Sequence, residues 1–309
     1  MTKPCVAVTG ASGFVGRWLM RHFAEVGVAA VPFFPPGIQG LGDTGLIRAT
    51  LTELQPDCVV HLAAIAAPAE ARRDPRAAFD VNLTGTLNLA EAILASSPRT
   101  RLVFAGSSEV YGRSFNHFPE GLTESAPLEP ATLYGVTKAS ADLLLGQMAG
   151  SGLDTVRFRP FNHTGPGQTD AYVVSAFARQ IAEIEKGRQP PVVAVGDLEA
   201  ERDFLDVRDV VRAYALAALL PESLPPGIAI NLASGTARRI STILEALLAM
   251  SPQAITVTQD PARMRANEIP RAVGDGARAR ALLGWSPSIP FETTLQDVLA
   301  HWQAADRPL

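Results

Sequence analysis

A tyrosine and a lysine four positions apart, Tyr134 and Lys138, are the residues of this sequence best suited to moving a proton. They lie near the start of a segment with helical spacing, 131–148, and residues four apart share one face of a helix. A lysine ammonium beside a phenol stabilises the phenolate and lowers the pKa of the phenol. Such a tyrosine can exchange a proton with a carbonyl or hydroxyl near neutral pH. The spacing alone also fits an ordinary helix with a surface tyrosine and lysine, so the choice depends on residues upstream.

Two serines and a glutamate directly follow an apolar strand upstream of this pair. The strand 102–105 leads through a glycine into Ser107, Ser108 and Glu109. Hydroxyls at the carboxyl end of a parallel strand point into the crevice where ligands bind, and one of them can hydrogen-bond a carbonyl that is being reduced. Serine, tyrosine and lysine together predict carbonyl or alcohol redox chemistry. The candidate catalytic residues are Ser107, Ser108, Glu109, Tyr134 and Lys138.

The N-terminal segment carries three glycines at the spacing of a dinucleotide site. The strand Cys5–Thr9 runs directly into the sequence GASGFVG at 10–16. The first glycine permits a tight turn, the second lets the backbone approach a pyrophosphate, and the third allows close packing of helix on strand. The helix that follows offers free N–H groups and a positive dipole end. A glycine-rich turn without a ligand would share the motif, but its position favours a nicotinamide dinucleotide lined by Gly10, Ser12, Gly13, Phe14, Val15 and Gly16.

The second predicted strand gives no sign of which dinucleotide is bound. A dinucleotide fold usually carries an acidic residue at the end of this strand for the adenosine ribose. Here the strand 28–34 leads into Pro35-Pro36-Gly37, and the next acid is Asp43. No arginine stands in the gap to attract a 2′-phosphate. The sequence therefore leaves NAD and NADP both open, with Asp43 as a candidate cofactor residue.

The elements that must position these residues alternate between strand and helix. Strands are expected at 5–9, 28–34, 58–62, 102–105 and 155–158, and helices at 13–26, 44–54, 75–95 and 131–148. This alternation predicts an α/β fold with a doubly wound parallel sheet of the Rossmann type and helices on both faces.

The second half of the chain is expected to form a smaller, interleaved α/β lobe. Helices are predicted at 174–186, 240–250 and 275–283, a turn leading into a helix at 204–220, and a strand at 228–232 that could return to the main sheet. We assign 1–165 to the dinucleotide-binding domain, with 204–235 returning to it. The substrate lobe is then made by 166–203 and 236–309.

Five short motifs resemble the extended short-chain dehydrogenase/reductase family. They are TGASGFVG, HLAA at 61–64, DVN at 80–82, GSSEVYG and YGVTK, and the resemblance covers nearly the whole chain. It implies that Ser107 or Ser108 acts with Tyr134 and Lys138. It also implies a structural role for His61 and a cofactor site that includes Leu62, Ala63, Ala64, Asn82, Tyr134, Lys138 and Pro160.

The second half resembles the branch of this family that acts on GDP-sugars. The segments 159–168, 175–187, 195–209 and 260–265 are similar to those of GDP-4-keto-6-deoxy-D-mannose reductases, which form GDP-D-rhamnose or its C4 epimer. Asn162 can donate to the sugar or diphosphate, and Arg202, in a polar turn, can clamp a diphosphate. Arg265 with Glu268 could serve the phosphate and ribose hydroxyls. Either arginine alone would also fit a solvated surface charge.

Glu109 keeps other reactions of the family open. In related 4,6-dehydratases a glutamate at this place removes the C5 proton, and glutamate also occurs here in epimerases. The sequence Asn162-His163-Thr164-Gly165 differs from the Asn-His-Glu-Ser of the mannose dehydratases, which favours a reductase. The alternatives are a nucleotide-sugar 4,6-dehydratase or 4-epimerase, and a catalytically idle dinucleotide-binding regulator, which would usually have lost Tyr134 or Lys138.

Composition limits the partners of the protein. The 309 residues carry a net charge of −4, which offers no overall attraction to nucleic acid or to an anionic membrane. No apolar run is long enough to span a bilayer, and no metal-ligand motif is evident. Two cysteines in strand-like apolar runs suggest a reducing compartment, the cytoplasm. The helices 75–95 and 131–148 look able to pair with a second copy, so we expect a homodimer.

Overall fold

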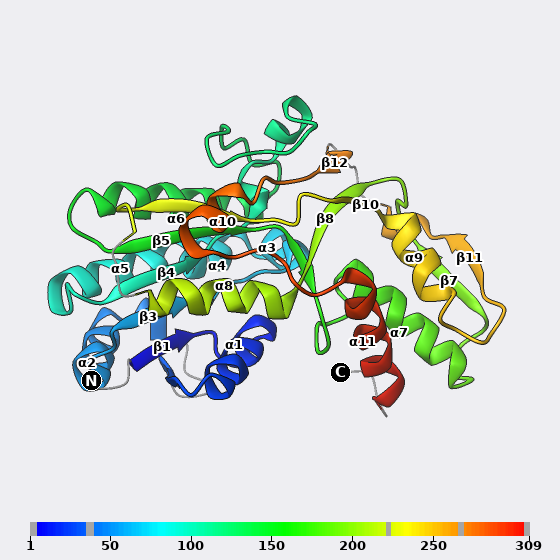
Figure 1. Ribbon diagram of the computed structural model, residues 1–309, viewed down its shortest axis with the longest axis horizontal. Helices are drawn as coiled ribbons and strands as arrows, with labels where there is room; N and C mark the ends of the chain where they lie inside the picture. The colour runs from blue at the N-terminus through cyan, green and yellow to red at the C-terminus, as the bar shows by residue number, and fades with distance from the viewer. Residues whose placement is uncertain (1–4, 35–39, 221–223, 265–268, 306–309) are drawn as a thin grey trace.

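The strand-like runs of the first half form one parallel sheet. The computed structural model describes residues 5–34, 40–220, 224–264 and 269–305 (Figure 1). Its largest sheet has six strands in the order β2-β1-β3-β4-β5-β9, and all neighbouring pairs are parallel. The strands are β1 (Cys5–Thr9), β2 (Ala29–Pro32), β3 (Cys58–His61), β4 (Arg101–Ala105), β5 (Thr155–Pro160) and β9 (Ile228–Leu232). The predicted α/β class with a doubly wound parallel sheet is confirmed.

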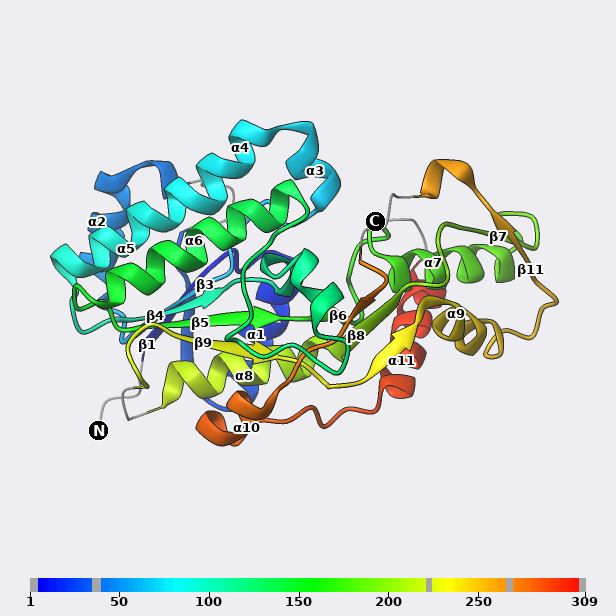
Figure 2. The same cartoon turned by 90° about the horizontal axis from the view of Figure 1, so that it is seen from above.

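Helices cover both faces of this sheet (Figure 2). Successive side chains of a strand point to opposite faces, so Val6 and Val8 of β1 pack with Leu19 on one face, while Ala7 packs in the core that contains Leu145 on the other. The first face carries α1 (Phe14–Glu25), α8 (Val207–Leu219) and α10 (Ala277–Leu283). The second carries α2 (Thr44–Leu54), α5 (Gly85–Ser96) and α6 (Leu133–Ala149). Each face therefore has its own apolar core.

A smaller lobe lies beyond the carboxyl ends of the main strands (Figures 1 and 2). Its central strand β8 (Glu201–Asp206) pairs with β6 (Asn162–Thr164), β10 (Ala237–Arg239) and β12 (Arg271–Ala272). A separate two-stranded parallel sheet consists of β7 (Val192–Val195) and β11 (Thr256–Gln259). The helices α7 (Val173–Glu185), α9 (Ile240–Leu248) and α11 (Phe291–Ala304) share one core.

Several features of this lobe differ from the sequence prediction, which includes none of its strands β6, β7, β8, β10, β11 and β12. The start of 204–220 is not a turn, because Phe204–Asp206 completes β8 before α8 begins. Backbone pairing with β6 holds these residues extended. Helix α11 was not predicted at all.

The predicted helix 75–95 is interrupted. It consists of α4 (Pro75–Phe79), a π-helical turn at Asp80–Thr84, and α5, and a short helix α3 (Pro68–Arg73) precedes it. The π-helical turn carries Asn82, whose side chain bonds to elements outside the helix. Single π-helical turns inside α-helices are frequent at functional sites.

The described residues contain two free thiols, no cluster of metal ligands and no helix that could cross a membrane. Both cysteines are free; Cys58 is buried and Cys5 is half-buried. Within the described ranges, His, Cys, Asp and Glu side chains form no group of three or more that could hold a metal ion. None of the described helices combines the length and the apolar character that a membrane crossing requires.

Candidate functional site

The glycine-rich loop between β1 and α1 fits a pyrophosphate. Gly10 has a φ of +68°, and a Cβ on it would lie 2.8 Å from the Ala63 nitrogen. A Cβ on Gly16 would lie 2.1 Å from the Gly10 oxygen, so only glycine permits this packing of helix on loop. At Gly13 a Cβ would meet only the Gly10 oxygen, at 3.2 Å, and would otherwise fill open space. Helix α1 begins here without a side-chain cap, which leaves its first N–H groups for an anion.

A buried histidine fixes the ends of β1 and β3 beside this loop. The Thr9 hydroxyl accepts hydrogen bonds from the Leu62 and Ala63 N–H groups, each at 3.1 Å, and lies 2.7 Å from His61 Nδ1. It must therefore donate its one proton to Nδ1, and His61 Nε2 donates to the Thr86 hydroxyl at 2.9 Å. Burial lowers the pKa of His61 to about 3. The imidazole is thus neutral, and its contacts are those of the structural residue that the family resemblance implies.

Asn82 uses its side chain to join the loop after β3 to α6. Its Oδ1 accepts from the Ile65 N–H at 2.8 Å, and its Nδ2 donates to the Ile65 carbonyl and, at 2.9 Å, to the Thr137 hydroxyl. The residue is 1% exposed. Asn82 therefore holds the loop that includes Ala63 and Ala64, both predicted to line the cofactor, against the helix that carries Tyr134.

Tyr134 and Ser107 meet at the carboxyl end of the sheet. Tyr134, in the first turn of α6, is 9% exposed and forms a hydrogen bond with the side chain of Ser107, which follows β4. Burial and the negative charge of Glu109 raise the pKa of the Tyr134 phenol, whereas the bond with Ser107 lowers it. The phenol therefore carries its proton at neutral pH. Ser108 is also buried, next to Ser107.

Lys138 lies one turn further along α6, as predicted, but bonds to the sheet. Its Nζ donates to the Ala105 carbonyl at 2.8 Å and lies 4.9 Å from the centre of the Phe104 ring. Burial and Glu109 set the direction of the Tyr134 shift and raise that pKa, so the effect of Lys138 on the phenol stays a prediction. Burial lowers the pKa of Lys138 itself to about 7.

Glu109 is oriented by the cap of the same helix. Thr132, the N-cap of α6, accepts from the Gly135 N–H at 2.9 Å and donates to Glu109 Oε2 at 2.7 Å. The carboxylate raises the pKa of Tyr134 and also that of Tyr172, the residue before α7. Burial lowers the pKa of Arg202, and the negative charge of Glu109 acts in the opposite direction. Glu109 thus lies within the electrostatic reach of both lobes.

The predicted substrate residues have different surroundings. Arg202 is in strand β8, not in a turn, because its backbone pairs with β10 and β12; its Nη1 donates to the Glu201 carbonyl at 2.8 Å. Asn162 opens β6 and is exposed. Arg265 and Glu268 lie outside the described residues. The structure therefore brings Arg202 near Glu109 and leaves Asn162 accessible on a neighbouring strand.

Two predicted cofactor residues lie in different parts of the fold. Pro160 ends β5, where its backbone pairs with Leu232 at the carboxyl end of the sheet. Asp43 is the N-cap of α2, and its Oδ1 accepts from the Leu46 N–H at 3.0 Å. This hydrogen bond stabilises the start of α2, so Asp43 has a structural role there besides its predicted role in cofactor binding.

The sequence prediction does not include Tyr172, whose phenol interacts electrostatically with Glu109 and Tyr134. Its own pKa is raised by burial, by Glu109 and by Glu70 of α3. Its surroundings come from three segments that are distant in sequence, and only the pairing of β6 with β8 brings the N-terminus of α7 to this edge. No local pattern of residues could have indicated this.

Comparisons with known proteins agree with this arrangement. Residues 6–233 match the model of the NAD dependent epimerase/dehydratase family. The chain is 36% identical over 301 residues to GDP-6-deoxy-D-mannose reductase of Pseudomonas aeruginosa, covering 97% of each chain. It is 28% identical to UDP-glucose 4-epimerase of Streptomyces lividans, covering 91% of each. Among solved structures it is similar to RMD from Pseudomonas aeruginosa complexed with NADPH, with a TM-score of 0.88, 33% identity and coverage of 98% of this chain and 99% of that one.

Proposed function

The chain belongs to the NAD dependent epimerase/dehydratase family, and from that premise we propose that it is a nucleotide-sugar 4-ketoreductase. The proposed reaction is the reduction of the C4 keto group of GDP-4-keto-6-deoxy-D-mannose to GDP-D-rhamnose or its C4 epimer. The observation that carries this proposal is the similarity over 97% of the chain to a GDP-6-deoxy-D-mannose reductase. The content of the candidate site supports the same reaction.

Tyr134 supplies the proton in this proposal. Reduction of a ketone adds a hydride to the carbon and a proton to the oxygen. Burial and Glu109 raise the pKa of Tyr134, so the phenol holds a proton to give. Ser107, which is hydrogen-bonded to Tyr134, would hold the carbonyl oxygen next to that donor. Lys138 fixes the end of β4 through the Ala105 carbonyl.

A nicotinamide dinucleotide, when bound, supplies the hydride. The loop that includes Gly10, Gly13 and Gly16 and the uncapped start of α1 would hold its pyrophosphate. The related structure with a TM-score of 0.88 holds NADPH. We propose NADPH or NADH as the reduced cofactor, because no acidic residue directly follows β2 to exclude a 2′-phosphate.

The remaining polar groups are assigned to the nucleotide-sugar. Glu109, held by Thr132, accepts a hydrogen bond from a sugar hydroxyl. Arg202 of β8 binds the diphosphate, since a guanidinium can form two parallel hydrogen bonds with phosphate oxygens. Asn162 of β6 donates a hydrogen bond to the same diphosphate. The smaller lobe, which includes β6 and β8 besides the predicted segments 166–203 and 236–309, would then cover the sugar.

The second candidate is a 4,6-dehydratase, which the presence of Glu109 favours. Dehydration also needs an acid for the leaving C6 hydroxyl. Thr164 stands where the mannose dehydratases have a glutamate, and it is 1% exposed with its hydroxyl donating to Gln168 Oε1 at 2.8 Å. No second acid of that kind is therefore available at this position.

Turnover of GDP-mannose separates the two reactions. The protein is incubated with GDP-mannose and a catalytic amount of oxidised cofactor, and the sugar is analysed by NMR. A reductase leaves GDP-mannose unchanged. Steady formation of the 4-keto-6-deoxy product would assign the chain to the dehydratases.

We also propose a cytoplasmic homodimer that pairs through α5 and α6. On α6, Val136 and Leu143 are seven residues apart, on one face, and are 36% and 61% exposed. Two exposed apolar side chains on one face of a helix offer a surface that a second copy can cover.

A further inference from the structure

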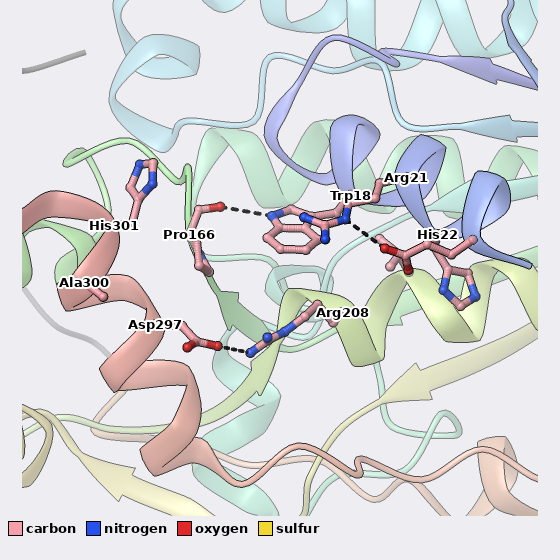
Figure 3. A pocket seen from close by; sticks show the side chains of 10 residues that line it. Trp18, Arg21, His22, Pro166, Arg208, Asp297, Ala300 and His301 are labelled. Atoms are coloured by element: carbon pink, nitrogen blue, oxygen red, sulfur yellow. Dashed lines mark hydrogen bonds and ion pairs between the residues drawn. The ribbon is translucent and has the colours of Figure 1, made fainter. Parts of the chain in front are cut away.

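Helix α1 faces the substrate lobe across a surface cavity (Figure 3). The cavity has a volume of about 570 Å³, and its walls include Trp18 of α1, Arg208 of α8, and Asp297 and His301 of α11. None of the proposed catalytic residues lines it. It therefore marks a second place where the two lobes meet, on the face of the main sheet that carries α1 and α8.

Two successive side chains of α1 bind two successive carbonyls of the substrate lobe. The Trp18 indole N–H donates to the Pro166 carbonyl at 3.0 Å (Figure 3). Arg17 donates through Nη2 to the Gly167 carbonyl at 3.2 Å and through Nη1 to the Ser12 carbonyl at 2.8 Å. One guanidinium thus joins the glycine-rich loop to the segment between β6 and α7.

That segment is fixed in turn to the substrate lobe. The Gln168 amide oxygen accepts from the Thr164 hydroxyl, and its Nε2 donates to the His163 carbonyl, both residues of β6. The Ser175 hydroxyl of α7 donates to the Gln168 carbonyl at 2.6 Å and accepts from the Trp302 indole N–H at 2.9 Å. A continuous series of hydrogen bonds therefore runs from Ser12 to β6, α7 and α11.

A second contact supports Trp18 from across the cavity. The Arg208 guanidinium lies 5.9 Å from the centre of the Trp18 ring and forms an ion pair with Asp206. It also forms an ion pair with Asp297 of α11 (Figure 3). The indole is therefore held between α1, α8 and α11. Its position depends on both lobes at once.

We propose that Arg17 and Trp18 are positioning residues that couple the dinucleotide site to the nucleotide-sugar site. A pyrophosphate bound to 10–16 fixes Ser12 and the start of α1. Through their hydrogen bonds, Arg17 and Trp18 then restrict the movement of Pro166 and Gly167. These two residues follow β6, which begins with the exposed Asn162 and is restricted in turn. The identity of the second ligand rests on the proposed function; the coupling itself does not.

The coupling must be reciprocal. If the cofactor raises the affinity for a nucleotide, the nucleotide raises the affinity for the cofactor by the same factor. A single hydrogen bond contributes a net factor of about two to ten. The Trp18 bond is partly buried and the Arg17 bonds are exposed, so Trp18 is the more informative residue. We expect NADPH to raise the affinity for GDP by about fivefold or more in the unaltered protein.

The test is calorimetric titration of GDP with and without NADPH, and of NADPH with and without GDP. GDP lacks the keto-sugar that would be reduced, so no turnover occurs. Trp18→Phe keeps the ring against Arg208 but removes the N–H that Pro166 accepts. We expect it to leave each binary affinity within about twofold while the coupling factor falls to near one. Trp285→Phe is the matched control, because it removes an indole N–H that donates to the Asp209 carbonyl, at 2.8 Å, and not to 166–167. It should keep the coupling factor.

Kinetics provide a second readout of the same variants. With saturating NADPH, Trp18→Phe should raise the KM for the keto-sugar about fivefold and leave kcat within about twofold. Arg17→Lys, which keeps the charge but removes the planar guanidinium that joins the two carbonyls, should fall between Trp18→Phe and the unaltered protein. Binding of UDP but not GDP would contradict the proposed function, and the coupling would then be measured with UDP. Independence of cofactor and nucleotide in the unaltered protein, or coupling retained in Trp18→Phe, would overturn the inference.

Discussion

Replacing Lys138 by methionine should change how stability depends on pH. Lys138 is 3% exposed, and burial lowers its pKa from 10.5 to about 7. Between these two pH values the unfolded chain holds a proton that the folded protein has released. Unfolding then takes up a proton, so the stability contributed by this site rises with pH through this window and is constant below it.

The size of the effect follows from the shift. A pKa difference of roughly 3.5 units corresponds to at most about 5 kcal/mol, at about 1.4 kcal/mol per unit. Between pH 6.5 and 9.5, the stability of the unaltered protein relative to Lys138→Met should rise by about 3 kcal/mol. A constant offset of about 1–3 kcal/mol comes from the Ala105 carbonyl, which loses its donor.

Urea unfolding followed by tryptophan fluorescence at pH 6.5, 8 and 9.5 measures both quantities. Comparison of the two proteins at each pH removes the titration of all groups that they share. A stability difference that does not change with pH would refute the reasoning, because it would mean that Lys138 keeps its ordinary pKa in the folded protein.

Further predictions concern the phenol, the glycines, the cofactor and the dimer. Tyr134→Phe should reduce kcat by about a hundred- to ten-thousandfold with unchanged NADPH affinity, and a near-normal rate would remove Tyr134 from its proposed role. Gly16→Ala should lower thermal stability, since its Cβ would lie 2.1 Å from the Gly10 oxygen, whereas Gly13→Ala should fold normally and lose cofactor affinity by calorimetry. The kcat/KM values for NADH and NADPH should differ by less than about tenfold, and a hundredfold difference would show that an unrecognised residue selects the cofactor. Leu143→Glu should convert the proposed dimer to monomer in light scattering, and an unchanged mass would place the interface elsewhere or exclude one.

The main sheet and its glycine loop were predictable from local patterns. Apolar runs such as 5–9 and 102–105 are fully explained by burial on both faces of a parallel sheet, and the glycine spacing is set by contacts within a few residues of the turn. The smaller lobe was less predictable, because strands such as β12, with two residues, carry no periodic signal. The charged residues around Arg202 in the sequence indicate a turn, whereas backbone pairing with β10 and β12 places it in β8.

The electrostatics of the site could not be derived from spacing. Tyr134 and Lys138 share a helix face, as predicted, but the partner of the lysine is a carbonyl of β4. The pKa of the tyrosine is raised first by burial and then by Glu109 from a separate loop. The π-helical turn that places Asn82 against Ile65 and Thr137 is a tertiary feature of the same kind.

Transfer of deuterium from labelled NADPH tests the central claim most directly. The protein is incubated with GDP-4-keto-6-deoxy-D-mannose and NADPH carrying deuterium at the transferred position, and the product is analysed by NMR and mass spectrometry. A 4-ketoreductase forms one deoxyhexose with deuterium at C4 for each NADPH consumed. Failure to consume NADPH with this sugar, or a product without deuterium at C4, would contradict the assignment.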